Sequence, residues 1–167
     1  VTTDDLLREA DTAMYRAKLA GRANFVVFDE SMHVEARRRL KLENDLRAAL
    51  EADEIRAYYQ PIIDLSTGSV VGFEALARWH HPEEGMIPPD AFIPVAEETG
   101  LIFEIGVRMM RQAVETMERM NRLPGGDTIR MNVNVSRKEL VDPRFFGRVC
   151  EVVSHMSVAP RRLRLEI

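Results

Sequence analysis

The 167-residue sequence predicts an α/β fold of β/α units that opens with an antiparallel pair of strands. After an opening pair of strands, the expected order is strand, helices, strand, helix and strand, which is typical of this class. The connection between the first two strands is too short for a parallel crossover, so these strands are antiparallel. Glu74, Asn134 and Glu166 lie on three successive strands, and β/α barrels build active sites from polar residues at strand ends.

The N-terminal residues predict a helix over 4–20 and a short strand over 24–28. Apolar residues recur at helical spacing in the first segment, at Leu6, Ala10, Met14 and Ala17. Thr2 or Thr3 can cap the helix, and Gly21 is expected to end it.

Residues 31–53 predict one continuous helix between this N-terminal piece and the rest of the chain. Its apolar seam consists of Val34, Leu40, Leu46 and Leu50. Its basic run consists of Arg37, Arg38, Arg39 and Lys41. We interpret this run as a solvated face rather than a lipid-binding surface. A helix in this place could also couple two modules or form a dimer.

The strands expected over 55–63 and 70–78 contain the first candidate site. Glu74 and Arg78 have an even separation, so on an extended strand both side chains point to one face, and the other face is apolar. Spacing alone favours an internal ion pair or an edge strand with one wet face, because a buried charge is costly without a partner.

Residues 80–89 predict a loop, since they include the turn formers Pro82, Gly85, Pro88 and Pro89. We interpret His80 and His81 as structural residues rather than metal ligands. Two helices are expected next, over 89–99 and about 101–122. The second has an apolar stripe of Ile105, Met109, Ala113, Met117 and Met120, which is typical of a core-facing helix.

The last part of the chain predicts a strand, two helices and a strand, over 128–135, 137–140, 143–156 and 162–167. Asn132 and Asn134 share one face of the first of these strands, while its apolar residues share the other. Oxygen donors from neighbouring strands, here Glu74, Asn134 and Glu166, suit a hard cation such as Mg²⁺ or Mn²⁺. Such an ion can activate water in phosphodiester hydrolysis.

The composition limits the class of protein. The net charge of −4 argues against a nucleic-acid polymer as partner. A single cysteine, Cys150, excludes an internal disulfide and favours a reducing cytoplasm. No apolar run approaches the roughly 20 residues that span a bilayer. We therefore expect a cytoplasmic segment without membrane contact, with any anchor of the parent protein in segments outside this chain.

The segment Glu74-Ala75-Leu76, followed by Ala77-Arg78-Trp79, resembles the signature of the EAL family of cyclic-di-GMP (c-di-GMP) phosphodiesterases. The resemblance continues in order through Tyr59-Gln60-Pro61-Ile62, Asn134-Val135-Ser136 and Leu165-Glu166-Ile167. Near the N-terminus, Ala10-Asp11-Thr12-Ala13-Met14-Tyr15 resembles the last helix of a GGDEF domain, the diguanylate cyclase module. The cyclase loop itself is absent from the sequence, so no cyclase activity is assigned.

The resemblance implies a TIM-like barrel of EAL type that hydrolyses c-di-GMP to linear pGpG with Mg²⁺ or Mn²⁺. It implies that Glu74 is the catalytic, metal-binding glutamate and that Asn134 and Glu166 are further metal ligands. The positions that it assigns to the dinucleotide are Gln60, Leu76 and Arg78.

The expected division is a GGDEF tail over 1–30, a linker helix over 31–53 and the first half of an EAL domain over 54–167. A complete barrel needs roughly 250 residues, so we expect later metal ligands beyond Ile167 and an inactive segment. The leading hypothesis is a fragment of a c-di-GMP phosphodiesterase. The alternatives are a c-di-GMP receptor without hydrolysis and a platform that dimerises through the EAL domain or the linker helix.

Overall fold

The computed structural model describes residues 2–19 and 25–167, and the chain divides into two compact units. The first unit is Val1–Asn44 and the second is Asp45–Ile167. Helix α2 (Glu30–Glu51) contributes residues to both units.

The first unit contains helix α1 (Thr3–Leu19) and the first part of α2, so the two expected helices are confirmed. The ring of Phe28 lies edge-on to His33, with 4.9 Å between the centroids. The strand expected over 24–28 is wrong for the residues described, because 25–28 are irregular. A strand needs a partner for its backbone groups, and none of the described strands pairs with this segment. Asn24 and Gly21 lie outside the described residues.

The second unit is built on a five-stranded sheet in the order β1-β2-β4-β5, with β3 paired to β2. The strands are β1 (Ile55–Ile63), β2 (Val70–His81), β3 (Gly85–Ile87), β4 (Arg130–Asn134) and β5 (Leu163–Glu166). β1 and β2 are antiparallel, whereas β2, β4 and β5 are parallel to one another. The α/β class and the antiparallel opening pair are therefore confirmed.

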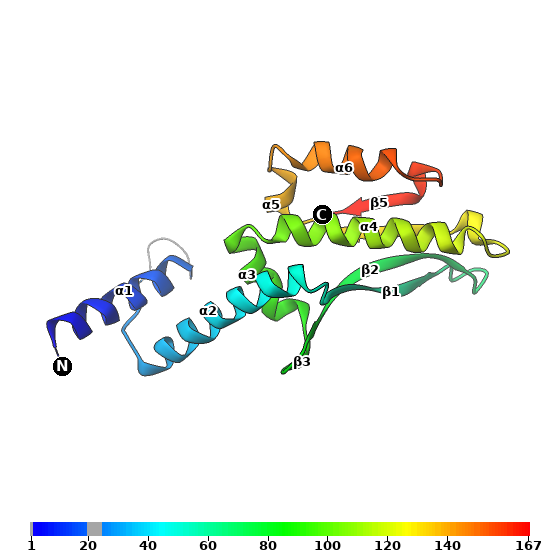
Figure 1. The fold of residues 1–167 in the computed structure, drawn as a ribbon. Coiled ribbons are helices and arrows are strands. Elements are labelled where there is room, and N and C mark those ends of the chain that lie inside the picture. The colour runs from blue at the N-terminus through cyan, green and yellow to red at the C-terminus, as the bar shows by residue number, and fades with distance from the viewer. Residues whose placement is uncertain (1, 20–24) are drawn as a thin grey trace. The chain divides into compact units, whose positions relative to one another are not determined.

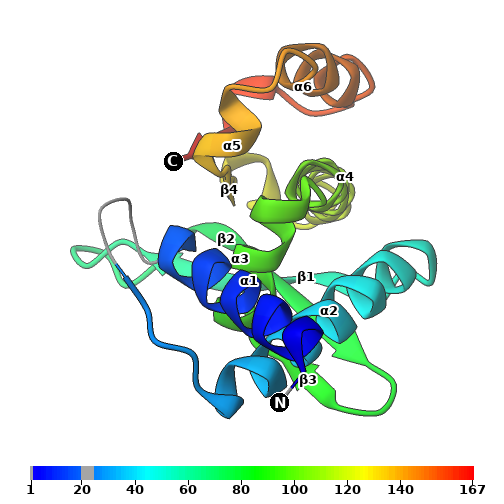
Figure 2. The same cartoon turned by 90° about the vertical axis from the view of Figure 1, so that its left-hand side faces the viewer.

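Helix α4 lies between the β1–β2 pair and helix α6 (Figures 1 and 2). The helices of this unit are α3 (Pro89–Thr99), α4 (Ile102–Met120), α5 (Arg137–Leu140) and α6 (Phe145–Ser154), with short 3₁₀ turns η1 (Gly126–Thr128) and η2 (Pro160–Arg162). Gly100, with φ of 79°, ends α3 in the left-handed conformation that favours glycine. The expected helices are confirmed, with shifts of two residues or fewer at most ends.

The core of this unit lies where α3 and α4 cover one face of the sheet. Met109 and Met117 of α4 are buried together with Met131 and Val133 of β4, which confirms the methionine stripe as core. Trp79 of β2 is fully buried, and its indole Nε1 donates a hydrogen bond to a carboxylate oxygen of Glu54 (3.1 Å). This bond satisfies the polar end of a large apolar side chain.

The loop expected over 80–89 is wrong in part, because β2 continues to His81 and pairs with β3. Gly85, with φ of 72°, allows the tight turn that returns the chain. The backbone N–H groups of Glu83 and Glu84 donate to Nδ1 of buried His81. His81 Nε2 lies 3.4 Å from Asp45 of α2. The structure thus gives His81 contacts that agree with a structural role.

Arg162 connects the loop after α4 to the start of β5. This buried side chain donates from Nε to the carbonyl of Ile129 (2.8 Å), from Nη1 to Oδ1 of Asn121 (2.6 Å) and from Nη2 to the carbonyl of Gly126 (2.5 Å). A guanidinium suits this place because its planar donors can serve several acceptors at once.

Replacing Arg162 by Leu is expected to loosen this junction. Its three acceptors would lose their donor, and leaving buried acceptors unpaired costs about 2 to 3 kcal/mol, or on the order of a hundredfold in local opening. Hydrogen exchange of the peptides that cover residues 126–134 in the intact protein measures this local opening. Arg162→Lys, which keeps the charge and some of the donors, should show an intermediate effect. Unchanged exchange in Arg162→Leu would contradict the assignment.

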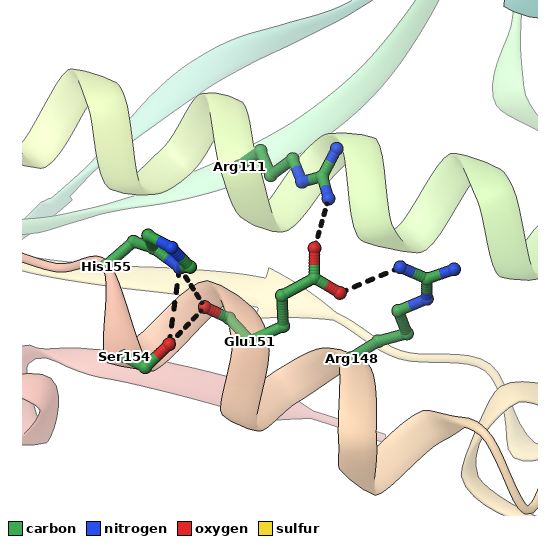
Figure 3. Close-up of polar contacts among 5 residues, drawn as sticks. All are labelled: Arg111, Arg148, Glu151, Ser154 and His155. Atoms are coloured by element: carbon green, nitrogen blue, oxygen red, sulfur yellow. Dashed lines mark hydrogen bonds and ion pairs between the residues drawn. The ribbon is translucent and has the colours of Figure 1, made fainter.

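Polar side chains also join α4 to α6 (Figure 3). Glu151 of α6 lies 2.9 Å from Nη2 of Arg111 and 2.7 Å from Nη1 of Arg148. The hydrogen bond from Arg148 is the main reason that the pKa of Glu151 is lowered. Because these groups are largely exposed, solvent screens the pairs and they contribute little to stability.

Candidate functional site

The candidate site lies on the face of the sheet opposite α4, where the register of three parallel strands gathers polar side chains. Glu74 of β2 is opposite Asn132 of β4, and Asn134 of β4 is opposite Glu166 of β5. Residues opposite one another in a ladder point to the same face, as do residues two apart on one strand. All four side chains therefore share one face.

Two carboxylates and two amides are paired diagonally on this face. The amide nitrogen of Asn134 donates to Oε1 of Glu74 (2.7 Å), and the amide nitrogen of Asn132 donates to Oε1 of Glu166 (2.6 Å). Spacing alone left open an internal Glu74–Arg78 ion pair or an edge strand with one wet face. Among the described residues no ion pair joins Glu74 to Arg78, whose Nη1 donates to the carbonyl of Ala77. The structure brings Glu74 and Asn134 into contact. The carboxylate of Glu166 is hydrogen-bonded to Asn132 and not to either of these two residues.

Glu74 lies in the middle of β2, as it does in the strand expected over 70–78. Within the parallel part of the sheet, β2 pairs with β4 only from Gly72 to Ala75. Beyond Ala75 the strand continues into its hairpin with β3. Glu74 is thus near the C-terminal end of the parallel section, which is the position where β/α folds place functional residues.

The end of β4 is held by backbone and capping contacts that fix Asn134. The N–H of Val135 donates to the carbonyl of Glu166 (2.7 Å). Ser136 and Glu139 form a capping box at the start of α5, with the N–H of Ser136 donating to Glu139 Oε2 (2.8 Å). Burial raises the pKa of Glu139, which is 3 % exposed. A Cβ at Gly106 would clash with Glu139 Oε1, so glycine leaves the space that this carboxylate occupies.

The three residues expected at the dinucleotide lie on β1 and β2. Gln60 is exposed on the edge strand β1, directly opposite Glu74. Leu76 and Arg78 follow Glu74 on the same face of β2. Arg78 Nη1 donates to the carbonyl of Ala77 (2.8 Å), so its guanidinium is turned back on its own strand. This face thus carries an amide on β1, and an apolar side chain and a cation on β2.

The donor set of this face fits a hard cation. Carboxylate and amide oxygens are the ligands that Mg²⁺ and Mn²⁺ prefer. Within residues 2–19 and 25–167, no three His, Cys, Asp or Glu side chains converge as a metal cluster. The two carboxylates are instead on β2 and β5, each held by an amide of the strand between them. The residues present would therefore contribute part of a metal coordination sphere.

Asn132 is the residue of this face that sequence reasoning did not place in the site. The signal was present, since Asn132 and Asn134 are two apart and share a face. The resemblance selected only Asn134. The hydrogen bond from Asn132 to Glu166 depends on which strands are neighbours, which local sequence does not specify.

A pocket of about 470 Å³ lies along α4, between the start of β1 and α6. Its charged lining includes Asp53, Arg56, Arg108, Arg111 and Arg148, and none of the candidate site residues lines it. Asp53 pairs with Arg56 and Arg108, and Glu151 pairs with the other two arginines. Each of these four arginines thus already has a carboxylate partner, and Glu104 and Glu115 also line the pocket. We therefore do not place the functional site there.

Comparison with known proteins identifies the class to which this fold and site belong. The profile of the EAL domain matches residues 43–167. The chain therefore belongs to the EAL domain family, which confirms the resemblance seen in its motifs.

Curated relatives match almost the whole chain. An uncharacterized signaling protein of Caulobacter vibrioides is 40 % identical over 166 residues, which are 99 % of this chain and 20 % of that protein. The bifunctional diguanylate cyclase/cyclic di-GMP phosphodiesterase MucR of Pseudomonas aeruginosa is 37 % identical over 99 % of this chain and 24 % of its own length. The cyclic di-GMP phosphodiesterase PdeR of Escherichia coli is 39 % identical over 91 % of this chain and 22 % of its length. The chain thus spans about a quarter or less of these relatives.

Solved structures share the fold. The PaMucR phosphodiesterase in its c-di-GMP complex has a TM-score of 0.71 and 34 % identity, over 76 % of this chain and 51 % of that one. The EAL domain of Xanthomonas citri FimX, in complex with c-di-GMP, has a TM-score of 0.66 and 26 % identity, over 80 % of this chain and 51 % of that one. The open sheet is therefore a partial EAL fold. Among the helices of the described residues, none combines the length and apolar character needed to span a bilayer.

Proposed function

We propose that the intact protein containing this chain hydrolyses c-di-GMP to linear pGpG. The observation that carries the proposal is the direct contact of Glu74 with Asn134 on the polar face of an EAL fold. Two relatives, MucR and PdeR, bear the name of c-di-GMP phosphodiesterase. A purified-enzyme assay with c-di-GMP and Mn²⁺, which follows pGpG by chromatography, tests the proposal, and the absence of pGpG would refute it.

In this proposal Glu74, Asn134 and Glu166 would hold Mg²⁺ or Mn²⁺, whose chemistry is to activate water and stabilise charge on the phosphate oxygens. The chain's own residues orient the substrate. Gln60 lies across the strand pair from Glu74, so its amide is suited to bind a polar group of the dinucleotide. Leu76 supplies an apolar contact on the same face, and Arg78 supplies a cation for phosphate.

A second candidate is a c-di-GMP receptor without hydrolysis. It is favoured by the separation of the two carboxylates, each of which is occupied by an amide donor. The pGpG assay distinguishes the two candidates. A receptor and a phosphodiesterase both bind c-di-GMP, but a receptor releases no pGpG. We favour the phosphodiesterase, since the residues at all three early metal positions of the EAL pattern are intact in this sequence.

The organisation of the parent protein is part of the proposal. We infer a GGDEF tail over 1–30, a linker helix over 31–53 and an EAL segment from residue 54 onward. The relative named as a bifunctional cyclase and phosphodiesterase aligns over 99 % of the chain, which supports this order. A dimer through the linker helix or the EAL segment would agree with it, and light scattering of the intact protein would test this.

Replacing Arg78 by Ala is expected to weaken c-di-GMP binding by roughly tenfold to hundredfold, because a charge-assisted hydrogen bond contributes about 1.5 to 3 kcal/mol. Binding of Mn²⁺ should remain within about a factor of two, since by this proposal Arg78 acts on phosphate. Calorimetry of each ligand alone measures both. Arg56→Ala is the matched control, since Arg56 is opposite Arg78 in the register but pairs with Asp53. Equal affinity of wild type and Arg78→Ala for c-di-GMP would exclude the role.

A further inference from the structure

Asn132 is the buried polar residue of the candidate face. It is 8 % exposed, whereas its neighbours Asn134 and Glu166 are exposed. β4 lies between β2 and β5, so Asn132 is enclosed by strands on both sides. Burying an amide costs free energy unless its donors and acceptor form hydrogen bonds. The hydrogen-bond partner of Asn132 therefore indicates what this side chain does.

That partner is Glu166. The Asn132 amide nitrogen lies 2.6 Å from Glu166 Oε1, and a hydrogen bond to a carboxylate is stronger than one between two neutral groups. Asn132 is directly opposite Arg164 in the register, and Glu166 is two residues further along the same face. The amide therefore reaches diagonally past its direct neighbour to the carboxylate.

We propose that Asn132 is a positioning residue for Glu166, which deepens the function proposed above and rests on it. The amide holds Oε1 of Glu166 and thereby fixes the orientation of the carboxylate, so that its other oxygen is left for a metal ion. It does so without adding charge between the carboxylates of Glu74 and Glu166, because an amide is neutral. Asn132 thus acts on the metal through Glu166 rather than as a ligand.

The test is the replacement of Asn132 by Leu, a side chain of similar size that has no donor. Loss of a residue that orients a metal ligand weakens metal affinity by about tenfold to hundredfold. Calorimetric titration of the intact protein with Mn²⁺ alone, without substrate, should show this loss. Asn132→Thr, which suits a strand but is too short to reach Glu166, should show the same loss and replaces the Leu variant if that variant does not fold.

Two controls separate positioning from general destabilisation. Val133→Ala changes the next residue of β4 on the opposite, core-facing side, and it should lower the melting temperature without weakening Mn²⁺ binding. The second control is the double variant Asn132→Leu with Glu166→Gln. If Asn132 acts through Glu166, its effect on Mn²⁺ affinity should largely disappear in that background, because the two changes are then not additive.

Each outcome decides the proposal. Unchanged Mn²⁺ affinity in Asn132→Leu, or a full additional loss in the Glu166→Gln background, would overturn the role of Asn132. If the role of Asn132 is overturned but the wild-type protein still binds Mn²⁺ and forms pGpG, the proposed function remains intact. Wild-type protein that binds no Mn²⁺ would overturn both proposals together.

Discussion

Replacing Glu74 by Gln is expected to abolish hydrolysis of c-di-GMP by the intact protein. Glutamine has nearly the same shape but no negative charge, so the proposed metal site loses a ligand that neutralises the cation. Metal stabilisation of the transition state contributes several kcal/mol, and a loss of about 4 kcal/mol corresponds to on the order of a thousandfold in rate. The hydrogen bond from Asn134 can still reach the side-chain oxygen of Gln, so the fold should be retained.

The measurement is the formation of pGpG by purified enzyme over a series of Mn²⁺ concentrations. Glu83→Gln is the matched control, because it makes the same change of charge at an exposed position of the β2–β3 turn. We expect that control to keep wild-type turnover. Turnover by Glu74→Gln within a factor of ten of wild type would refute the assignment of Glu74.

The 167-residue chain produced by itself is expected to show no phosphodiesterase activity and to self-associate. In the described sheet, β5 pairs with β4 on one side and has no strand on its other side. Phe146 and Ile167 are 77 % and 79 % exposed. An unpaired strand edge is a template for intermolecular pairing, and exposed apolar side chains add to that tendency. The carboxylates of the proposed metal site in this chain are limited to Glu74 and Glu166.

Size-exclusion chromatography with light scattering gives the oligomeric state, and an assay with Mn²⁺ gives the activity. The intact protein, measured in the same buffer, is the control and is expected to be active. A monomeric 167-residue chain that forms pGpG would show that this half of the EAL fold is sufficient, and would contradict our account of the site.

Helices and strands with strong periodicity could be predicted from the sequence, because their residues alone determine which face is apolar. Met109, Met117 and Val133 are buried as their spacing indicates. The expected strand over 24–28 does not form within residues 25–28, since strand formation depends on a partner rather than on local composition. The hairpin of β2 and β3 was missed because its turn formers resemble those of an open loop.

The family could be recognised from the amino-acid sequence, and so could the candidate residues that we propose for the site. The ordered motifs around Glu74, Asn134 and Glu166 do not depend on packing, and the match of residues 43–167 to the EAL domain confirmed the family. Which of these side chains are in contact became evident from the folded chain. Strand order and register place Asn134 on Glu74 and Asn132 on Glu166, because a hydrogen bond between strands depends on residues that are far apart in the chain.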